Sequence, residues 1–137
     1  MEGQNIMTEL VNVDELAAQA LANNVALLAM LPNGADSIYH DNAPENGEYP
    51  LIQYSMMTEI PAFHCDNKLK AVDNVVRITI INNTNAGRYS LKNAVYNALV
   101  DAGFMWINTN TVRNGREYYT ALDFRLGTLV KYNNNVQ

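Results

Sequence analysis

The sequence predicts an α+β fold in which an antiparallel sheet of about four to five strands carries helices on one face. Apolar residues recur at helical spacing in the first third of the chain, and residues 75–81 are rich in β-branched side chains. An Asn-Gly pair separates two extended runs near the C-terminus. The 137 residues, 48% of them hydrophobic, suffice for one domain, expected over 1–137 with a polar tail from about 127 to 137.

Composition and charge argue against several classes of protein. The single cysteine, Cys65, cannot form an internal disulfide, so the fold does not depend on an oxidising compartment. No signal-peptide pattern and no apolar run of ~18 residues occurs, so we expect neither secretion nor a membrane span. The net charge is −5, and the Lys and Arg residues form no cluster that would suit a phosphate backbone. We expect neither sequence-specific DNA binding nor a bound cofactor.

The first elements are helical. Asn12 and Glu15 have the spacing of a capping box, and apolar residues follow at helical intervals over 13–21. Asn23-Asn24 interrupts, and a second short helix is predicted over 25–31 before a Pro-Asn-Gly stop. Residues 6–11 are not assigned.

Three strands are predicted next. A short one covers 38–40, and Tyr49-Pro50 opens another over 51–57, because proline has no N–H and belongs at the first residue of a strand. Residues 59–73, which include Pro61 and alternating charges, are predicted to form a long connection. Residues 75–81 form the most clearly predicted strand, with Val76, Ile78 and Ile80 on one face.

A helix is predicted over 91–102, with Ser90 as its N-cap and Gly103 just past its end. Asn114-Gly115 then predicts a two-residue hairpin turn. In that register Arg113 pairs with Arg116, and the core face of the hairpin carries Met105, Ile107, Leu122 and Phe124.

The opposite face of this hairpin would carry several aromatic residues among charges: Phe104, Trp106 and Tyr119, with Arg125. Two interpretations remain open. Scattered exposed aromatic residues are ordinary on any protein surface. Alternatively, aromatic residues beside arginine indicate a protein–protein contact.

In this order, several pieces resemble the tail-completion family of long-tailed bacteriophages and prophages, the tail-to-head joining or tail terminator proteins. The most specific is Ala-Pro-Glu, a short spacer and Tyr-Pro-Leu-Ile-x-Tyr, between residues 43 and 54. The leading helical part, the Pro61-Ala-Phe-His64 bend, the strand 75–81 and the segment 90–104 also match. Together they span most of residues 10–126.

The resemblance implies a structural virion protein without catalytic residues, an α+β subunit of a ring that is typically hexameric. Its partners would be copies of itself, the tail tube protein and the head connector or stopper protein. Genomic DNA would cross the lumen without sequence-specific binding, and the acidic balance fits such passage. The location would be the virion tail or neck, and the host cytoplasm during assembly.

Three candidate contact surfaces follow. They are the outward hairpin face, the hairpin tip and the connection 59–73, which we expect to become ordered on assembly. Their residues are Phe104, Trp106, Tyr119, Arg125, Arg113, Arg116, Glu59, His64, Asp66, Lys68 and Lys70.

The alternative is a small intracellular enzyme or a metal- or ligand-binding domain that uses His64, Cys65 and Asp66. Thiolate, imidazole and carboxylate can all bind zinc, and a Cys–His pair can act as a nucleophile. However, successive side chains of an extended segment point to opposite sides, and His40 is the only other histidine. We therefore expect no metal site here.

Overall fold

Five strands form the main sheet, in the order β2–β3–β4–β6–β5. The computed structural model describes the backbone of residues 6–134 and the side chains of residues 10–130. Neighbouring strands are antiparallel except β2 and β3, which are parallel. The α+β class is confirmed, with a sheet that is mixed at one edge. The strands are β2 (Ile38–His40), β3 (Leu51–Cys65), β4 (Lys68–Asn82), β5 (Met105–Asn114) and β6 (Glu117–Leu129).

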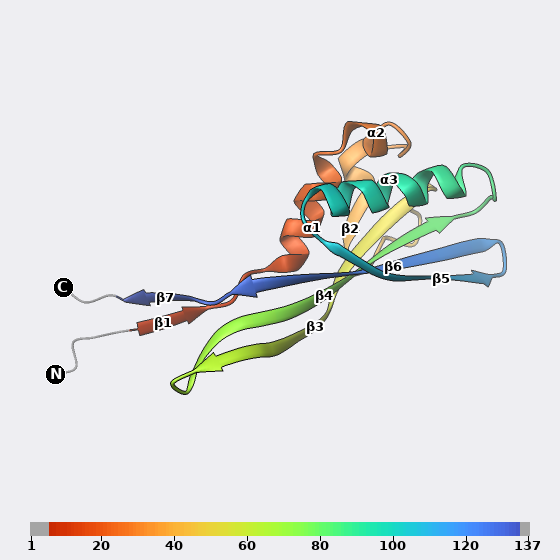
Figure 1. Cartoon of the computed structure of the whole chain (residues 1–137). Coiled ribbons are helices and arrows are strands. Elements are labelled where there is room, and N and C mark those ends of the chain that lie inside the picture. Colours follow the sequence, from red (N-terminus) through yellow and green to blue (C-terminus); the bar gives the residue numbers. More distant parts are fainter. Residues whose placement is uncertain (1–5, 135–137) are drawn as a thin grey trace.

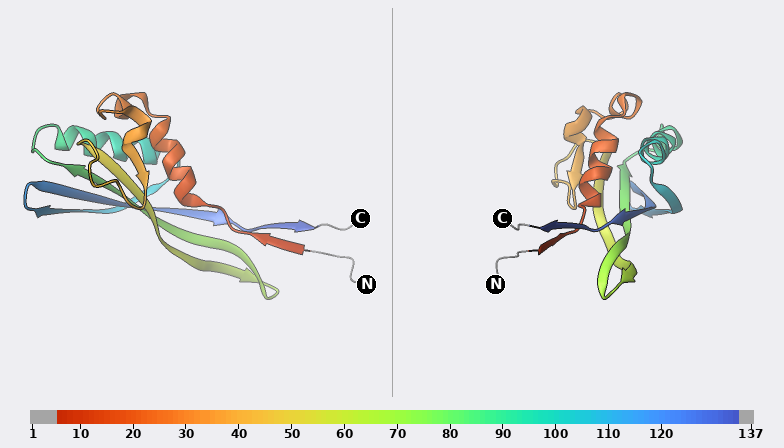
Figure 2. Two further views of the ribbon diagram at one scale, coloured as in Figure 1. Left: turned by 180° about the vertical axis from the view of Figure 1, so that it is seen from behind. Right: turned by 60° about the vertical axis from the view of Figure 1, so that its left-hand side comes forward.

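Helices cover one face of this sheet (Figure 1). They are α1 (Val13–Ala22), α2 (Val25–Leu28), the 3₁₀ turn η1 (Gly34–Ser37) and α3 (Arg88–Asp101). Seen along the sheet in the right-hand view of Figure 2, α1, η1 and β2 lie to one side, and α3 and β5 lie to the other. None of the helices in the described residues is long and apolar enough to cross a membrane.

The core lies between the helices and the middle of the sheet. Val76, Ile78 and Ile80 of β4 point toward the helices and are buried, as the alternation of the sequence predicts. From the helices come Ala17 and Leu21 of α1, Leu27 of α2 and Leu91, Val95 and Leu99 of α3.

The ends of the helices differ in part from the prediction. Asn12 makes no side-chain cap, whereas Asn24 accepts a hydrogen bond from the Leu27 N–H at 2.9 Å. Helix α3 begins at Arg88, after Gly87, and not after Ser90. Gly103 ends it as predicted: with φ of 98° it lets the backbone N–H of Phe104 reach the Leu99 carbonyl at 3.0 Å.

The segment 59–73 is not a loop, and this prediction was wrong. Strands β3 and β4 run through it and join at a two-residue turn, Asp66-Asn67, whose φ values are 54° and 62°. Asp and Asn tolerate such values better than other residues except glycine. Pro61 fits because β3 pairs with β2 only at Ile52–Tyr54, so its outer edge is open from Ser55 onward.

The β5–β6 hairpin exists, but its register differs by two residues from the predicted one. Asn114 pairs with Glu117, so the turn is Gly115-Arg116, and Arg113 pairs with Tyr118. A bulge lies between Trp106 and Asn108 and rotates the start of β5. As a result Met105 and Ile107 are exposed, and the predicted apolar face holds only for Leu122 and Phe124.

Residues before α1 and after β6 form a second, two-stranded ladder. Strand β1 (Ile6–Glu9) pairs antiparallel with β7 (Lys131–Asn134). The segment expected as a polar tail from about 127 therefore contains the end of β6 and β7; residues 135–137 lie outside the described part. Figure 1 shows this ladder extending away from the helix layer.

Candidate assembly surfaces

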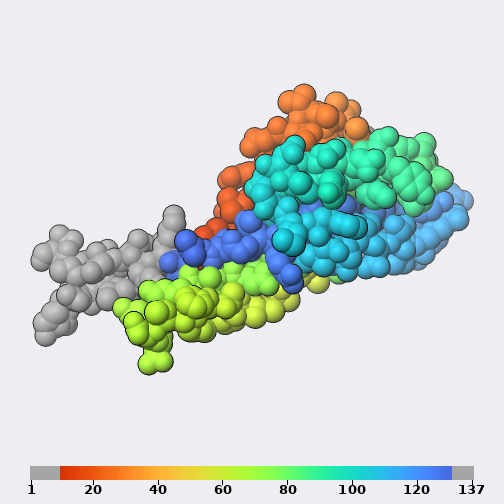
Figure 3. Space-filling model, viewed as in Figure 1, coloured from red at the N-terminus to blue at the C-terminus, as the bar shows by residue number. Residues whose placement is uncertain are grey.

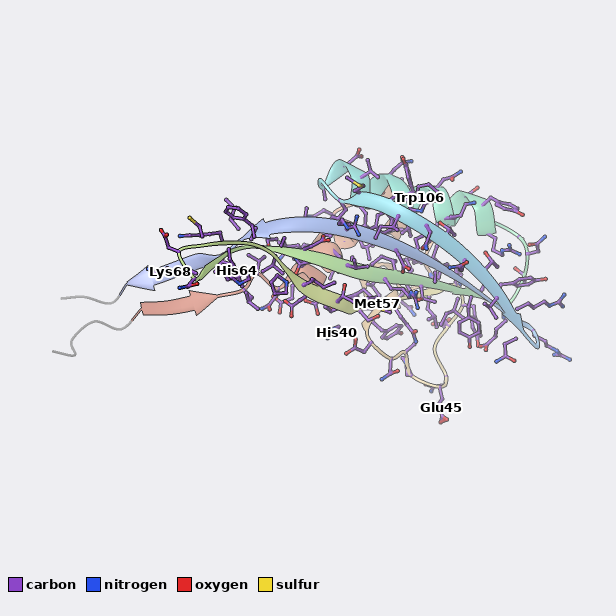
Figure 4. All side chains as sticks on the ribbon, turned by 60° about the horizontal axis from the view of Figure 1, so that its bottom comes forward. His40, Glu45, Met57, His64, Lys68 and Trp106 are labelled. Atoms are coloured by element: carbon purple, nitrogen blue, oxygen red, sulfur yellow. The ribbon has the colours of Figure 1, made fainter. Side chains whose placement is uncertain are left out.

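The β3–β4 hairpin extends well beyond the helices and forms a projecting arm, residues 57–73. Figure 3 shows its tip as a separate projection of the surface, and Figure 4 labels His64 and Lys68 there. Every β3 residue of the arm is exposed, and three of them are large and apolar: Met57 (43% exposed), Ile60 (52%) and Phe63 (58%). Because the arm has no helix over it, these side chains find no core to join within the molecule.

The structure brings five predicted contact residues together on this arm. Glu59, His64, Asp66 and Lys68 are exposed, and Lys70 is half-buried. Behind them the arm, β6 and the start of β5 enclose a groove lined by Ala62, Val72, Met105, Arg125 and Leu129, among others.

The predicted aromatic face is not formed. Phe104 is 3% exposed and belongs to the core, because it precedes β5 at the Gly103 turn and points under α3. The bulge turns Trp106 to the helix-covered side, where it pairs with the buried Phe124. Tyr119 lies on the face that the helices do not cover, which we call the open face. Trp106 and Tyr119 are therefore on opposite sides of the sheet.

Trp106 nevertheless stays half exposed, at the margin between β5 and α3. Its indole N–H donates to the Thr109 hydroxyl at 2.9 Å, and its ring meets Tyr96 edge-on, with the centroids 6.1 Å apart. Together with Lys92 they line a groove between helix and strand.

Charged side chains occupy the open face, and ion pairs hold them. Arg77 and Asp123 on the paired strands β4 and β6 form two hydrogen bonds of 2.8 and 3.1 Å. The Asp123 carboxylate raises the pKa of Arg77. The predicted contact residue Arg125 lies on this face too and pairs with Asp73 at 3.2 Å.

A polar tether fixes the loop before β3 to the start of β6. The hydroxyls of Tyr49 and Tyr119 both donate to the carboxylate of Glu117. Both hydrogen bonds favour the charged carboxylate and therefore lower the pKa of Glu117. The bond from Tyr49 has the larger effect. The same bonds raise the pKa values of both tyrosines. Residues 68 apart are thereby connected, which no local pattern could have indicated.

We expect Glu117→Gln to return the tyrosine titrations toward ordinary values, because the neutral amide cannot accept as strongly as a carboxylate. Ultraviolet difference titration of phenolate measures this. The stability from the tether is present above the ordinary pKa of glutamate and is lost as pH falls through the lowered pKa of Glu117. The stability gap between the wild type and the variant should therefore close on acidification. Glu45 lies on the loop that carries Tyr49, and Glu45→Gln should leave the tyrosine titrations and the pH dependence of stability unchanged.

A second cluster joins β2 to α1. The His40 ring stacks on Tyr54 with centroids 4.9 Å apart, and its Nε2 lies 3.0 Å from the Asp14 carboxylate. Asp41 follows at 3.7 Å. The sequence analysis missed this cluster because its members come from three separate elements.

The proposed metal or catalytic triplet occupies the arm tip. His64 and Cys65 end β3, Asp66 begins the turn, and all three are exposed. His40 is held at Asp14 in another part of the sheet. Among the described residues, no group of three His, Cys, Asp or Glu side chains is placed to hold a metal ion.

No protein-family model and no curated protein matches this chain. Its fold is similar to that of a chain in the solved structure "Virion of native gene transfer agent (GTA) particle". The TM-score is 0.58 and the sequence identity 17%, over 87% of this chain and 95% of that chain. The chain therefore shares its fold, over nearly its whole length, with a subunit of that virion.

Proposed function

We propose that this protein is a structural subunit of a phage-like particle, and that copies of it form a ring that completes the tail and joins it to the head. The observation that carries the proposal is the fold shared with a chain of a gene transfer agent virion, matched over 95% of that chain. The tail-completion resemblance, which spans most of residues 10–126, supports the same conclusion.

In this role the protein works by shape and surface complementarity. Its partners are other copies of the chain, the tail tube protein and the head connector or stopper protein. The ring, a hexamer by the family resemblance, encloses a lumen through which genomic DNA passes without sequence-specific binding. The protein assembles in the host cytoplasm and remains in the tail or neck of the virion.

The arm is the proposed contact with the tail tube protein. It continues the strand direction beyond the helix layer, and it presents Ile60 and Phe63 on a strand whose outer edge is open (Figure 1). An open edge with exposed apolar side chains is costly for a monomer and favours a partner. Exposed pairs of large apolar residues also provide the anchors on which interfaces depend.

Electron microscopy of the protein co-expressed with the tail tube protein of the same particle tests this function. We expect rings that cap the tubes. The variant Ile60→Asp/Phe63→Asp should reduce the fraction of capped tubes by about tenfold or more, because it places two carboxylates in an apolar contact.

Val25→Asp is the matched control. Val25 is 80% exposed and lies at the start of α2, away from the arm, so this variant should cap tubes as the wild type does. If the wild type forms no ring, alone or on tubes, the proposed function is wrong. If the arm variant caps tubes normally, only the role of the arm is wrong.

A further inference from the structure

The two halves of the chain carry opposite charge, which the net charge of −5 conceals. Residues 1–67 contain ten acidic residues and no Lys or Arg. Residues 68–137 contain all nine basic residues and four acidic ones. The net charge of residues 1–67 is thus −10 and that of residues 68–137 is +5, so charge is distributed very unequally between the two halves.

The fold keeps most of these charges apart in space. The acidic half supplies α1, η1 and β2 at the β2 edge of the sheet, and the loop before β3, which reaches from there to the start of β6. Figure 4 shows His40 and Glu45 near one margin of the sheet, with Trp106 near the opposite margin. We call this side the acidic border. Its carboxylates are Asp14, Glu15, Asp36, Asp41 and Glu48, and all but Asp14 are exposed.

The opposite side, which we call the cationic border, lies where the N-terminal end of α3 meets the β5–β6 hairpin. Its cations are Arg88, Lys92, Arg113 and Arg116. The guanidinium of Arg88 lies 4.6 Å from the centroid of the Tyr118 ring, and that of Arg113 lies 5.1 Å from it on the hairpin side. Lys92 lies over Tyr89 at 5.1 Å. The α3 N-terminus adds its own partial positive charge.

No salt bridge in the part of the chain that the structure describes neutralises these cations. The arginines that form salt bridges in the described residues are Arg77 and Arg125, both on the open face of the sheet. Glu117, at the start of β6 beside Arg116, is already bound by Tyr49 and Tyr119. The cationic border therefore combines cations and aromatic rings, the residue types that are enriched at protein interfaces.

Among the described residues, no salt bridge joins the two borders within one molecule, and β2 and β5 are the opposite edge strands of the sheet. A second copy can bring its acidic border to the first copy's cationic border. Such a contact joins two different surfaces, so it can repeat from copy to copy and closes into a ring when the rotation permits.

We propose that neighbouring subunits associate in this head-to-tail manner, with the acidic border of each copy docked on the cationic border of the next. The inference rests on the proposed ring function and names the surfaces that form the ring. It also leaves the arm free, since the β5–β6 turn with its cations and the tip of the arm lie at opposite ends of the sheet (Figure 1). A second copy fits the cationic border better than nucleic acid does, because its acidic border supplies the complementary charge.

The test reverses each border in the full-length protein. One variant carries Arg113→Glu/Arg116→Glu, and the other carries Asp36→Lys/Glu48→Lys. Each alone should weaken subunit association, measured by sedimentation equilibrium, by about tenfold or more, because like charges then face each other. An equimolar mixture should recover association, since each contact again joins opposite signs. Association of the wild type should also weaken with added salt.

Asp101→Lys provides the control, because this exposed residue at the end of α3 belongs to neither border. All variants should keep the circular dichroism spectrum of the wild type, since the changed side chains are exposed. Rings that are insensitive to both reversals, or a mixture that does not recover, would overturn the docking inference and leave the ring function standing. A wild type that stays monomeric under every condition, tubes included, would overturn both.

A single-stranded oligonucleotide, followed by fluorescence anisotropy, examines the competing occupant. We expect no binding at physiological salt, because the acidic half repels phosphate. Binding that disappears in Arg113→Glu/Arg116→Glu, with subunit association unchanged, would mean that the cationic border is a nucleic-acid surface and would refute the inference.

Discussion

Replacing Phe124 by alanine should lower the free energy of unfolding by about 3–5 kcal/mol. Phe124 is fully buried in β6, where it pairs with Val76 of the central strand β4. Its ring fills the space beneath the helices. In the alanine variant the neighbouring strands β4 and β5 cannot collapse into the cavity, because their pairing with β6 holds them in place. Urea denaturation monitored by circular dichroism measures the change.

Met105→Ala is the control on the adjacent strand. Met105 is 63% exposed, so its truncation should change the unfolding free energy by no more than about 0.5 kcal/mol. A loss below about 1 kcal/mol for Phe124→Ala would mean that the helix layer does not cover β6 as described. The comparison thus tests the bulge as well, since without it Met105 would face the core, as the sequence had predicted.

Elements whose cause is local were predictable from the sequence. Strand β4 needs only its own alternation of Val76, Ile78 and Ile80, and the end of α3 needs only Gly103, whose φ of 98° disfavours other residues. The start of β3 directly after Pro50 is local too, since a missing N–H is a property of one residue.

Elements whose cause is pairing were not predictable. Pro61 indicates a loop in isolation, and it is accepted in β3 only because that strand has an open edge. The bulge after Trp106 shifts the β5–β6 register and leaves Met105 and Ile107 exposed, yet no turn residue indicates it. The pair Asn114-Gly115 correctly indicates a hairpin, but the two residues of the turn are Gly115 and Arg116.

The candidate surfaces follow the same division. The contact residues predicted within 59–73 lie together on the arm, because they are close in sequence; their role as a contact surface stays a prediction. Those of the outward hairpin face were not, because their grouping depended on the register. The charge segregation between residues 1–67 and 68–137 was visible in the sequence, but the net charge alone does not reveal it.

Replacing Asp123 by alanine should lower the unfolding free energy by about 2–3 kcal/mol, whereas Asp73→Ala should cost less than about 1 kcal/mol. The two carboxylates are a matched pair, each bound to an arginine across β4 and β6. The Asp123 side chain is 12% exposed and makes two bonds, so its removal leaves the Arg77 guanidinium without a partner in a partly desolvated place. Asp73 is 34% exposed and its arginine 48%, so water replaces the lost bond.

A double-mutant cycle with Arg77→Met separates the bond from the cost of an unpaired charge. If the pair serves the fold, Arg77→Met/Asp123→Ala should recover part of the stability lost in Asp123→Ala, and ring formation should be unaffected. The open face would then be a braced outer surface, with assembly confined to the arm and the two borders. Equal losses from Asp123→Ala and Asp73→Ala would contradict this, because burial would then not decide what each ion pair contributes.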